Sequence, residues 1–244
     1  MDVRDAGDID GRNGPDLFAG SKGEEAKIGW WETPADARKL DAWTWHPLYD
    51  AGWIMSLIEH DMDGDGDPDL VATDRKGPNS GILWIENPSR SVHRIGSVGE
   101  EELMFMKMAD LDGDGLAEAV AATLSGPIVR YRREADGWRR YEIARPPKVT
   151  RGKAVAVGDL DLDGRADLAF SAEGADGELE GVFWLSWRDS PDDPVWEVHR
   201  VSGPEGVKFD RIELLDLDGD GDLDLITCEE RDNLGVIWYE NPTR

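Results

Sequence analysis

A nine-residue acidic segment occurs five times in this chain of 244 residues, and it limits the possible folds more than any other feature of the sequence. The second copy reads "DMDGDGDPD" and the fifth reads "DLDGDGDLD". The copies begin at Asp8, Asp61, Asp110, Asp159 and Asp216, so the intervals between them are 53, 49, 49 and 57 residues. A repeat of about 50 residues is typical of the blades of a β-propeller. The spacing therefore predicts five similar structural units in series.

Short apolar segments accompany each acidic segment in a fixed order, with up to four segments in a repeat. In the second repeat they are "GWIMSLIEHD" before the acidic residues, "DLVATD" after them, and then "GILWIENP" and "SVHRI". Such segments are rich in β-branched and aromatic residues and are bounded by Gly, Pro, Asp and Asn, which is typical of β-strands and turns. No segment predicts a helix of two turns or more. The sequence therefore predicts an all-β fold, a five-bladed β-propeller of four-stranded antiparallel blades.

The last repeat stops at "ENPTR", before its fourth strand, so we expect an incomplete last blade. The alternative is that the five blades are a piece of a larger ring. We expect a monomer, or a part of a larger chain. The expected single domain covers residues 1–244, with blades at about 1–50, 51–97, 98–146, 147–202 and 203–244.

Carboxylates occupy positions one, three, five and nine of the acidic segment in the last four repeats, and glycine occupies position six. Charges this close together destabilise a folded chain unless something neutralises them. Alternate side chains of a curled loop can point to one centre, and a cluster of carboxylate oxygens suits Ca²⁺. The sequence therefore predicts about four calcium sites; the simpler alternative is that the segments are turns that bind nothing. The expected ligands are Asp61, Asp63, Asp65 and Asp69; Asp110, Asp112, Asp114 and Glu118; Asp159, Asp161, Asp163 and Asp167; and Asp216, Asp218, Asp220 and Asp224.

The first repeat departs from this pattern, because Arg12 stands at position five and Asn13 at position six. The guanidinium of Arg12 is expected to pair with Asp8 and Asp10 in place of an ion. A fifth calcium site, made of Asp8, Asp10 and Asp16, is therefore expected to be weak or vacant.

The acidic segments, the "DLV" or "DLI" strands that follow them, and the downstream "WIENP" and "WYENP" resemble FG-GAP/VCBS-type repeats. The resemblance implies a calcium-stabilised β-propeller whose ions are structural and lie at one rim. It also implies an extracellular or periplasmic location, although the first ten residues show no signal peptide. It implies no single activity, because this repeat type occurs in adhesins, lectin-like modules and some carbohydrate-active enzymes.

The formal net charge of -26 argues against nucleic acid and anionic membranes as direct partners. No run of residues approaches the roughly 18 apolar residues of a membrane helix, so no membrane insertion is expected. The single cysteine, Cys228, excludes an internal disulfide and is expected to be a buried small residue.

Positions that recur in most blades are expected to be architectural, because a catalytic group is needed only once. One recurrent position carries tryptophan, and we expect these rings to pack between blades. The alternative is that one of the rings stacks on a sugar. Another carries histidine, and equivalent positions in a ring do not converge on one zinc ion or substrate. The two sets are Trp30, Trp84, Trp184 and Trp238, with Arg130 in the third blade, and His46, His93 and His199, with Tyr141 in the third blade.

The loops at the rim opposite the acidic segments carry both carboxylates and cations. Such a mixture can hydrogen-bond a glycan or another small polar ligand. The alternative is that these are ordinary charged loop residues that contact only solvent. The ligand-binding candidates are Asp74, Arg75, Lys76, Glu173, Lys208, Glu229, Glu230 and Arg231.

Three functions remain open from the sequence. The leading hypothesis is a non-catalytic, calcium-stabilised binding module for a glycan or another extracellular ligand. The second is a polysaccharide lyase or sugar dehydratase that removes a proton next to a carboxyl or keto group. The candidates that neutralise this group are Arg75, Lys76, Arg151, Lys153 and Lys208, and the candidate bases are Tyr49, His46 and Lys153. The third is a structural or interaction domain of a larger surface protein, in which the free edge of the last blade pairs with a partner.

Overall fold

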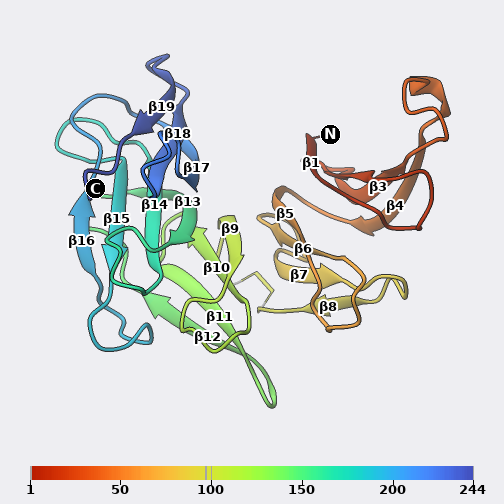
Figure 1. Cartoon of the computed structure of the whole chain (residues 1–244), viewed down its shortest axis with the longest axis horizontal. Helices are drawn as coiled ribbons and strands as arrows, with labels where there is room; N and C mark the ends of the chain where they lie inside the picture. The colour runs from red at the N-terminus through yellow and green to blue at the C-terminus, as the bar shows by residue number, and fades with distance from the viewer. Residues whose placement is uncertain (1, 97, 100, 244) are drawn as a thin grey trace. The chain divides into compact units, whose positions relative to one another are not determined.

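The structure is a computed structural model that describes residues 2–96, 98–99 and 101–243. These residues form nineteen β-strands and one short 3₁₀ turn, Leu40–Ala42, and they contain no α-helix. The strands are arranged in five antiparallel sheets, four with four strands and the last with three (Figure 1). The predicted all-β fold of blade-like sheets with an incomplete last sheet is therefore confirmed. No helix in the described residues has the length and apolar character needed to cross a membrane.

The chain forms two compact units, Met1–Leu103 and Met104–Arg244, which we describe separately. The predicted single domain stays a prediction. The first unit holds the first sheet, with β1 (Asp2–Gly7), β2 (Asp16–Gly20), β3 (Lys27–Glu32) and β4 (Thr44–Asp50), and the second, with β5 (Ile54–His60), β6 (Asp69–Asp74), β7 (Gly81–Ile85) and β8 (Val92–Arg94).

The second unit holds the remaining three sheets, the first of which begins at the boundary residue Leu103. The third sheet has β9 (Leu103–Ala109), β10 (Glu118–Thr123), β11 (Ile128–Glu134) and β12 (Gly137–Ile143); the fourth has β13 (Arg151–Gly158), β14 (Asp167–Glu173), β15 (Val182–Ser186) and β16 (Glu197–Arg200); and the fifth has β17 (Phe209–Leu215), β18 (Asp224–Glu229) and β19 (Gly235–Tyr239).

Each sheet is a meander in which consecutive strands are neighbours. The second strand lies between the first and the third, and in β6 and β10 every residue is buried. This burial explains the apolar residues 70–72 and 119–122 in the middle of these strands. The fourth strand lies at the sheet edge, so β4 has no fully buried residue. The fourth strand therefore contributes little to the core, whereas the first strand, which also lies at an edge, is largely buried in the second and fourth sheets.

The apolar core of each unit is shared by neighbouring sheets. In the first unit Phe18 and Ile28 of the first sheet pack in one cluster with Leu83 of the second. In the second unit Val182 of the fourth sheet packs in one cluster with Phe209 of the fifth. Each sheet therefore buries a face against its neighbour in the same unit, as layered β structures must.

The recurrent tryptophan and histidine are cross-strand neighbours on the third and fourth strands of the same sheet. Their rings stack, with centroid separations of 4.5 Å for Trp30–His46, 4.1 Å for Trp84–His93 and 3.7 Å for Trp184–His199. In the third sheet the same pair of positions holds Arg130 and Tyr141. These stacks account for the recurrence of both residue types by packing within a blade.

Candidate metal sites and the opposite rim

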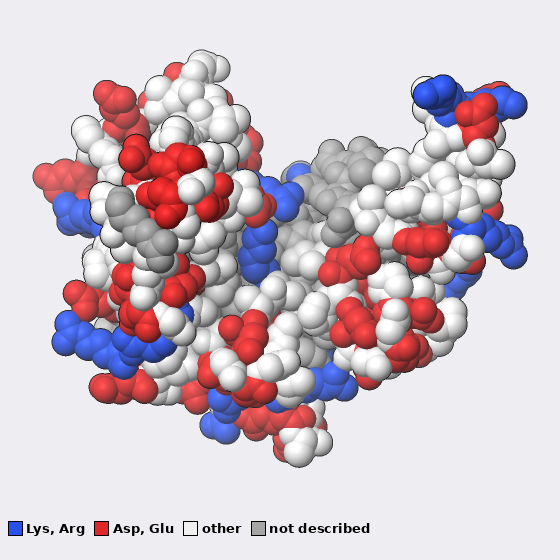
Figure 2. Space-filling model, in the orientation of Figure 1, with Lys and Arg blue, Asp and Glu red and all other residues white. Residues whose placement is uncertain are grey.

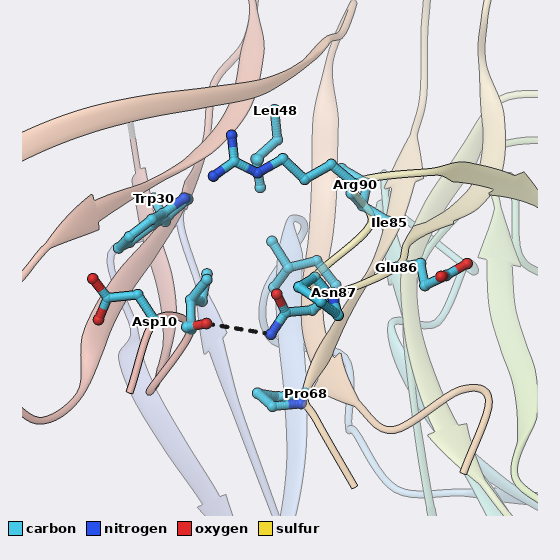
Figure 3. Close-up of a pocket in the computed structure, with 11 residues that line it drawn as sticks. Asp10, Trp30, Leu48, Pro68, Ile85, Glu86, Asn87 and Arg90 are labelled. Atoms are coloured by element: carbon cyan, nitrogen blue, oxygen red, sulfur yellow. Dashed lines mark hydrogen bonds between the residues drawn. The ribbon is translucent and has the colours of Figure 1, made fainter. Parts of the chain in front are cut away.

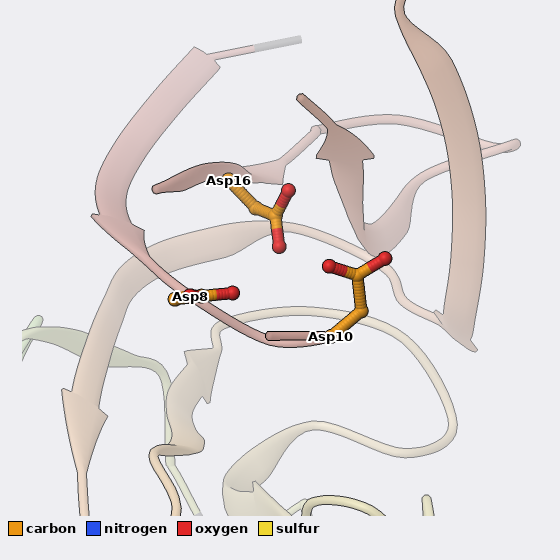
Figure 4. Close-up of side chains that lie close together, drawn as sticks. All are labelled: Asp8, Asp10 and Asp16. Carbon is orange, nitrogen blue, oxygen red and sulfur yellow. The ribbon is translucent and has the colours of Figure 1, made fainter. Parts of the chain in front are cut away.

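Each acidic segment forms the loop between the first and second strands of its sheet. Acidic side chains gather in several patches on the face shown in Figure 2. In every loop three carboxylates offer oxygen atoms that lie within 4.8 Å of one another, and Figure 4 shows the first of these groups. The groups are Asp8, Asp10 and Asp16; Asp61, Asp63 and Asp69; Asp110, Asp112 and Asp114; Asp159, Asp161 and Asp167; and Asp216, Asp218 and Asp220.

The loops curl because their own carboxylates accept backbone hydrogen bonds. In the second loop the two oxygens of Asp61 accept the N–H groups of Gly64 (2.8 Å) and Gly66 (3.0 Å). Both glycines have positive φ, 80° and 92°, a conformation that favours glycine. The turn therefore favours glycine at position four as well as at the predicted position six. In the fourth loop position four is Leu162, which adopts a φ of 61° without this freedom.

The carboxylate at position nine ties its loop to the end of the third strand. Asp69 is fully buried, and its Oδ2 accepts the N–H of Met62 (2.8 Å) within the loop. Its Oδ1 accepts the N–H of Asn87 (2.8 Å), just beyond β7. Asp16 and Asp224 make the same pair of contacts in their own sheets. This carboxylate therefore links the acidic loop to the end of the third strand by hydrogen bonds.

Burial of these carboxylates next to other negative charges affects their protonation. Burial raises the pKa of Asp16 and of Asp69, and nearby aspartates add to the shift. Burial raises the pKa of Asp167 to about 7, with Asp161 and Asp163 contributing. A nearby cation would oppose these shifts because it favours the charged form.

The asparagine of the "ENP" sequence connects a sheet to the acidic loop of the preceding sheet. The side-chain Nδ2 of Asn241 donates to the carbonyl of Leu160 at 2.8 Å, and Asn87 reaches the carbonyl of Ile9 at 3.5 Å. Asn87 and Trp30 line a pocket of about 290 Å³ between the first two sheets (Figure 3). An equivalent pocket of about 460 Å³ lies between the fourth and fifth sheets. The loops are therefore linked to the packing of neighbouring blades.

Arginines contact the carboxylates of two loops. In the third loop the buried Arg130 donates from Nη2 to Asp112 (2.7 Å) and from Nε to Glu118 (2.8 Å). In the fourth loop Arg165 donates from Nε to Asp163 (2.7 Å). Among the described side chains, no lysine or arginine pairs with the predicted ligands of the second loop. The predicted pairing of Arg12 with Asp8 and Asp10 is likewise not among the ion pairs of the described residues.

Two of the predicted ligand-binding carboxylates are structural. Asp74 is fully buried, and its oxygens accept the N–H groups of Gly52 (2.9 Å) and Trp53 (2.7 Å). Glu229 is also buried, and it accepts several backbone N–H groups of the loops around it. Both residues end a second strand, where a carboxylate can hold the connection to the adjacent loop.

The other candidates in the first unit form local pairs. Arg75 pairs with Glu102 at 2.6 Å, and the ammonium of Lys76 lies 4.8 Å from the ring of Trp53. The hydroxyl of Tyr49 accepts a hydrogen bond from Arg94 (2.8 Å), and burial raises its pKa. The Nε2 of His46 lies 2.8 Å from Glu32. These residues do not converge on one reaction centre within the unit.

The second unit brings several candidates together around Lys153. The mostly buried Lys153 ammonium lies 2.6 Å from Oε1 of Glu173 and 3.3 Å from Oδ1 of Asp210. Burial, together with a hydrogen bond to Glu230, raises the pKa of Asp210 to about 6. Glu230 also pairs with Lys208, and its pKa is lowered to about 2 by hydrogen bonds to Asp210 and Lys208.

Two further candidates lie at the border of this cluster. The guanidinium of Arg151 lies 3.9 Å from Glu173. The exposed Arg231 follows directly after the cluster residue Glu230. We call Lys153, Glu173, Lys208, Asp210 and Glu230 the rim cluster.

The sheets and loops define an all-β repeat protein with an acidic, metal-type loop in each blade. Residues 110–170 match the FG-GAP-like repeat, from the first aspartate of the third loop to a residue within β14. The other loops and sheets repeat this arrangement, which is consistent with an FG-GAP/VCBS-type repeat protein, so the predicted resemblance is confirmed. No curated protein sequence matches the chain.

Proposed function

We propose that this chain is a calcium-stabilised binding module. The observation that carries the proposal is the repetition of an acidic loop in which three carboxylates offer oxygen atoms within 4.8 Å of one another. In the second loop the residues that would hold the ion are Asp61, Asp63, Asp65 and Asp69. Their oxygens are the hard donors that calcium prefers, and no basic side chain among those described neutralises Asp61, Asp63 or Asp69. A bound calcium ion supplies the positive charge that lets these carboxylates stay together.

The chain's own residues connect this loop to the rest of the blade. Asp69 is held by the backbone of its loop and by the end of β7, and Asn87 reaches the preceding loop. An ion that fixes the carboxylates therefore also favours the packed arrangement of the strands. Calcium is expected to stabilise the folded state because it binds that state alone.

The experiment is a calcium titration followed by calorimetry and by thermal unfolding. A site filled at 100 times its dissociation constant adds about 2.7 kcal/mol to the free energy of unfolding. We expect excess EDTA to lower the unfolding temperature and Asp61→Asn to reduce the number of bound ions. Asp36→Asn, an exposed aspartate outside the loops, serves as the matched control. No heat of binding and an unfolding temperature that EDTA leaves unchanged would contradict the proposal.

The proposed ligand is a glycan or another small polar molecule, and the rim cluster is its proposed site. The cluster combines three carboxyl groups with two lysines, and the side chains of Lys208 and Glu230 are 38% and 42% exposed. Polar groups of both signs can hydrogen-bond a polyhydroxylated ligand. The resemblance to FG-GAP/VCBS-type repeats supports an extracellular or periplasmic location for such binding.

A glycan array with calcium present tests this ligand class. We expect binding that Lys208→Met weakens and that the exposed substitution Lys39→Met leaves unchanged. Incubation with polyuronates, followed by the absorbance of the new double bond, tests the alternative of a lyase. Binding without turnover supports the module, whereas turnover supports the enzyme.

A second candidate function is strand pairing at β19, the free edge of the fifth sheet. In the second sheet His93 both stacks on Trp84 and lies 2.7 Å from Glu86. The fifth sheet carries the equivalent Trp238 and Glu240, but no fourth strand covers them in the described part of the chain. Trp238 is 48% exposed there. We propose that this edge accepts an extended polypeptide segment that carries a histidine.

The probe for this edge is a labelled peptide with the sequence of residues 89–96, "SRSVHRIG", which forms the fourth strand of the second sheet. We expect it to bind the full chain, and to bind more weakly when its histidine is replaced by alanine or when the chain carries Trp238→Ala. Equal binding by the alanine peptide, or no binding at millimolar concentration, would exclude this function.

A further inference from the structure

The third acidic loop differs from the others in the residue of the third strand that contacts its carboxylates. We infer that Arg130 neutralises this loop as a built-in cation, so that the third loop forms without calcium and contributes no ion to the total. The inference rests on the proposed function, in which the other loops do bind calcium.

Arg130 lies in β11, at the position that carries tryptophan in the other four sheets. Its side chain has no exposure to solvent. Nη2 donates to Oδ2 of Asp112 at 2.7 Å, and both Nε and Nη2 donate to Oε1 of Glu118. Asp112 and Glu118 are positions three and nine of the loop, which are two of the four expected calcium ligands. A buried guanidinium therefore already holds half of the expected ligand set.

Further contacts fix the guanidinium in this place. Nη1 donates to Oδ1 of Asp192 at 2.6 Å, and Asp192 belongs to the connection between β15 and β16 of the next sheet. The neighbouring Arg132 lies 3.3 Å from the same carboxylate oxygen of Asp112. The ring of Tyr141 lies 5.2 Å from the carbon of the Arg130 guanidinium. Two of the four carboxylates of the loop, Asp112 and Glu118, are thus paired with fixed guanidinium groups of the protein.

A calcium ion in this loop would compete with these contacts. It would have to draw Asp112 and Glu118 away from Arg130, which would leave a buried guanidinium without two of its three carboxylate partners. The ion and the guanidinium would also repel each other at close range. The oxygens of Asp110 already accept the N–H groups of Gly113 and Gly115, so the loop is curled by its own backbone.

The second loop is the matched case without an arginine. Trp84 occupies the equivalent position and stacks on His93. Asp63 and Asp69, the equivalents of Asp112 and Glu118, have no basic partner among the described side chains. The two loops therefore share a sequence pattern and differ in how their charge is neutralised.

Hydrogen exchange of the wild-type chain, in calcium and in EDTA, tests the inference without a substitution. We expect EDTA to speed exchange in residues 61–69 by about tenfold or more, and to leave residues 110–118 unchanged. Equal acceleration in both loops would overturn the inference. If EDTA changes hydrogen exchange in neither loop, the proposed function fails. The number of calcium ions bound by the variants described next then decides whether the third loop binds an ion.

Counting ions by native mass spectrometry gives the second test. We expect Asp63→Asn to lower the number of bound calcium ions by one, and Asp112→Asn to leave it unchanged. Since Asp112→Asn could disturb the buried pair, Arg130→Trp provides the complementary variant and is expected to raise the number by one. A loss of one ion in Asp112→Asn, or an unchanged count in Arg130→Trp, would overturn the inference.

Discussion

Glu229, at the end of β18, is the carboxylate whose contribution to stability can be derived most directly from its contacts. Its Oε1 accepts the N–H groups of Lys208 and Arg231, both at 3.0 Å, and that of Val207 at 3.2 Å. Its Oε2 accepts the N–H of Asp232 at 2.7 Å. The side chain therefore joins the loop before β17 to the turn after β18, and it is only 3% exposed. We predict that Glu229→Gln destabilises the protein in a pH-dependent way.

The magnitude follows from the pKa of this carboxyl group. Burial acts to raise the pKa of Glu229, but the backbone N–H donors outweigh it and lower the pKa from 4.5 to about 2. A depression of this size corresponds to about 3 kcal/mol of stability at pH 7. Because the folded-state pKa lies below the unfolded one, this stability is present in full above pH 4.5. It is lost as the pH falls toward 2, and about 1.4 kcal/mol remains at pH 3.

Urea denaturation of the wild type and of Glu229→Gln, at several pH values between 7 and 3 and at constant calcium, measures this contribution. We expect the difference in free energy of unfolding to be about 3 kcal/mol at pH 7 and roughly half of that at pH 3. Effects of pH on the acidic loops are common to both chains and cancel in the difference. Glu178→Gln, at an exposed position, is the control and should change stability by less than about 0.5 kcal/mol. A difference below about 1 kcal/mol at pH 7, or one that does not vary with pH, would refute the reasoning.

Two further substitutions test the loops and their links. Leu162→Gly is expected to raise the free energy of unfolding by about 1 kcal/mol, because a non-glycine residue at a φ of 61° is strained; a lower midpoint of thermal unfolding would contradict this. Asn241→Ala is expected to lower it by about 1–2 kcal/mol, because its side chain donates to the carbonyls of Leu160 and Leu223. Asn87→Ala should lower the free energy of unfolding by less, since the hydrogen bond from Asn87 to the preceding loop is 3.5 Å long. If urea denaturation gives equal losses of stability for Asn87→Ala and Asn241→Ala, this prediction is wrong.

The sequence predicted the strands and the acidic loops well because both are encoded locally. The fully buried β6 is a short apolar segment bounded by an acidic turn and a polar loop. The loop begins and ends with aspartates, and its glycines have the positive φ that the turn requires. Repetition strengthened these signals, since an error in one blade is corrected by the others. The recurrent tryptophan and histidine were recognised as architectural for the same reason.

The sequence could not predict contacts that depend on register or on backbone partners. Arg130 stands out as an arginine at a tryptophan position, but its contact with Asp112 depends on how β11 packs behind the loop. Asp74 and Glu229 look like solvated loop residues in the sequence. Their partners are backbone N–H groups, which every residue except proline carries, so no residue type marks such a contact. The glycine at position four recurs in four of the five loops, and this recurrence is the sequence signal for its positive φ.

Under the proposed function, the arginine contacts predict that the two units depend on calcium to different degrees. In the first unit neither acidic loop has a basic partner for its carboxylate group among the described side chains. In the second unit Arg130 pairs with the third loop and Arg165 with the fourth, while the fifth loop has no arginine at these two positions. Mutual repulsion of carboxylates, once an ion is removed, is strongest where no guanidinium reduces it. Chelation is therefore expected to loosen residues 2–94 before residues 104–173, and the order in which their amides lose protection from hydrogen exchange measures this difference.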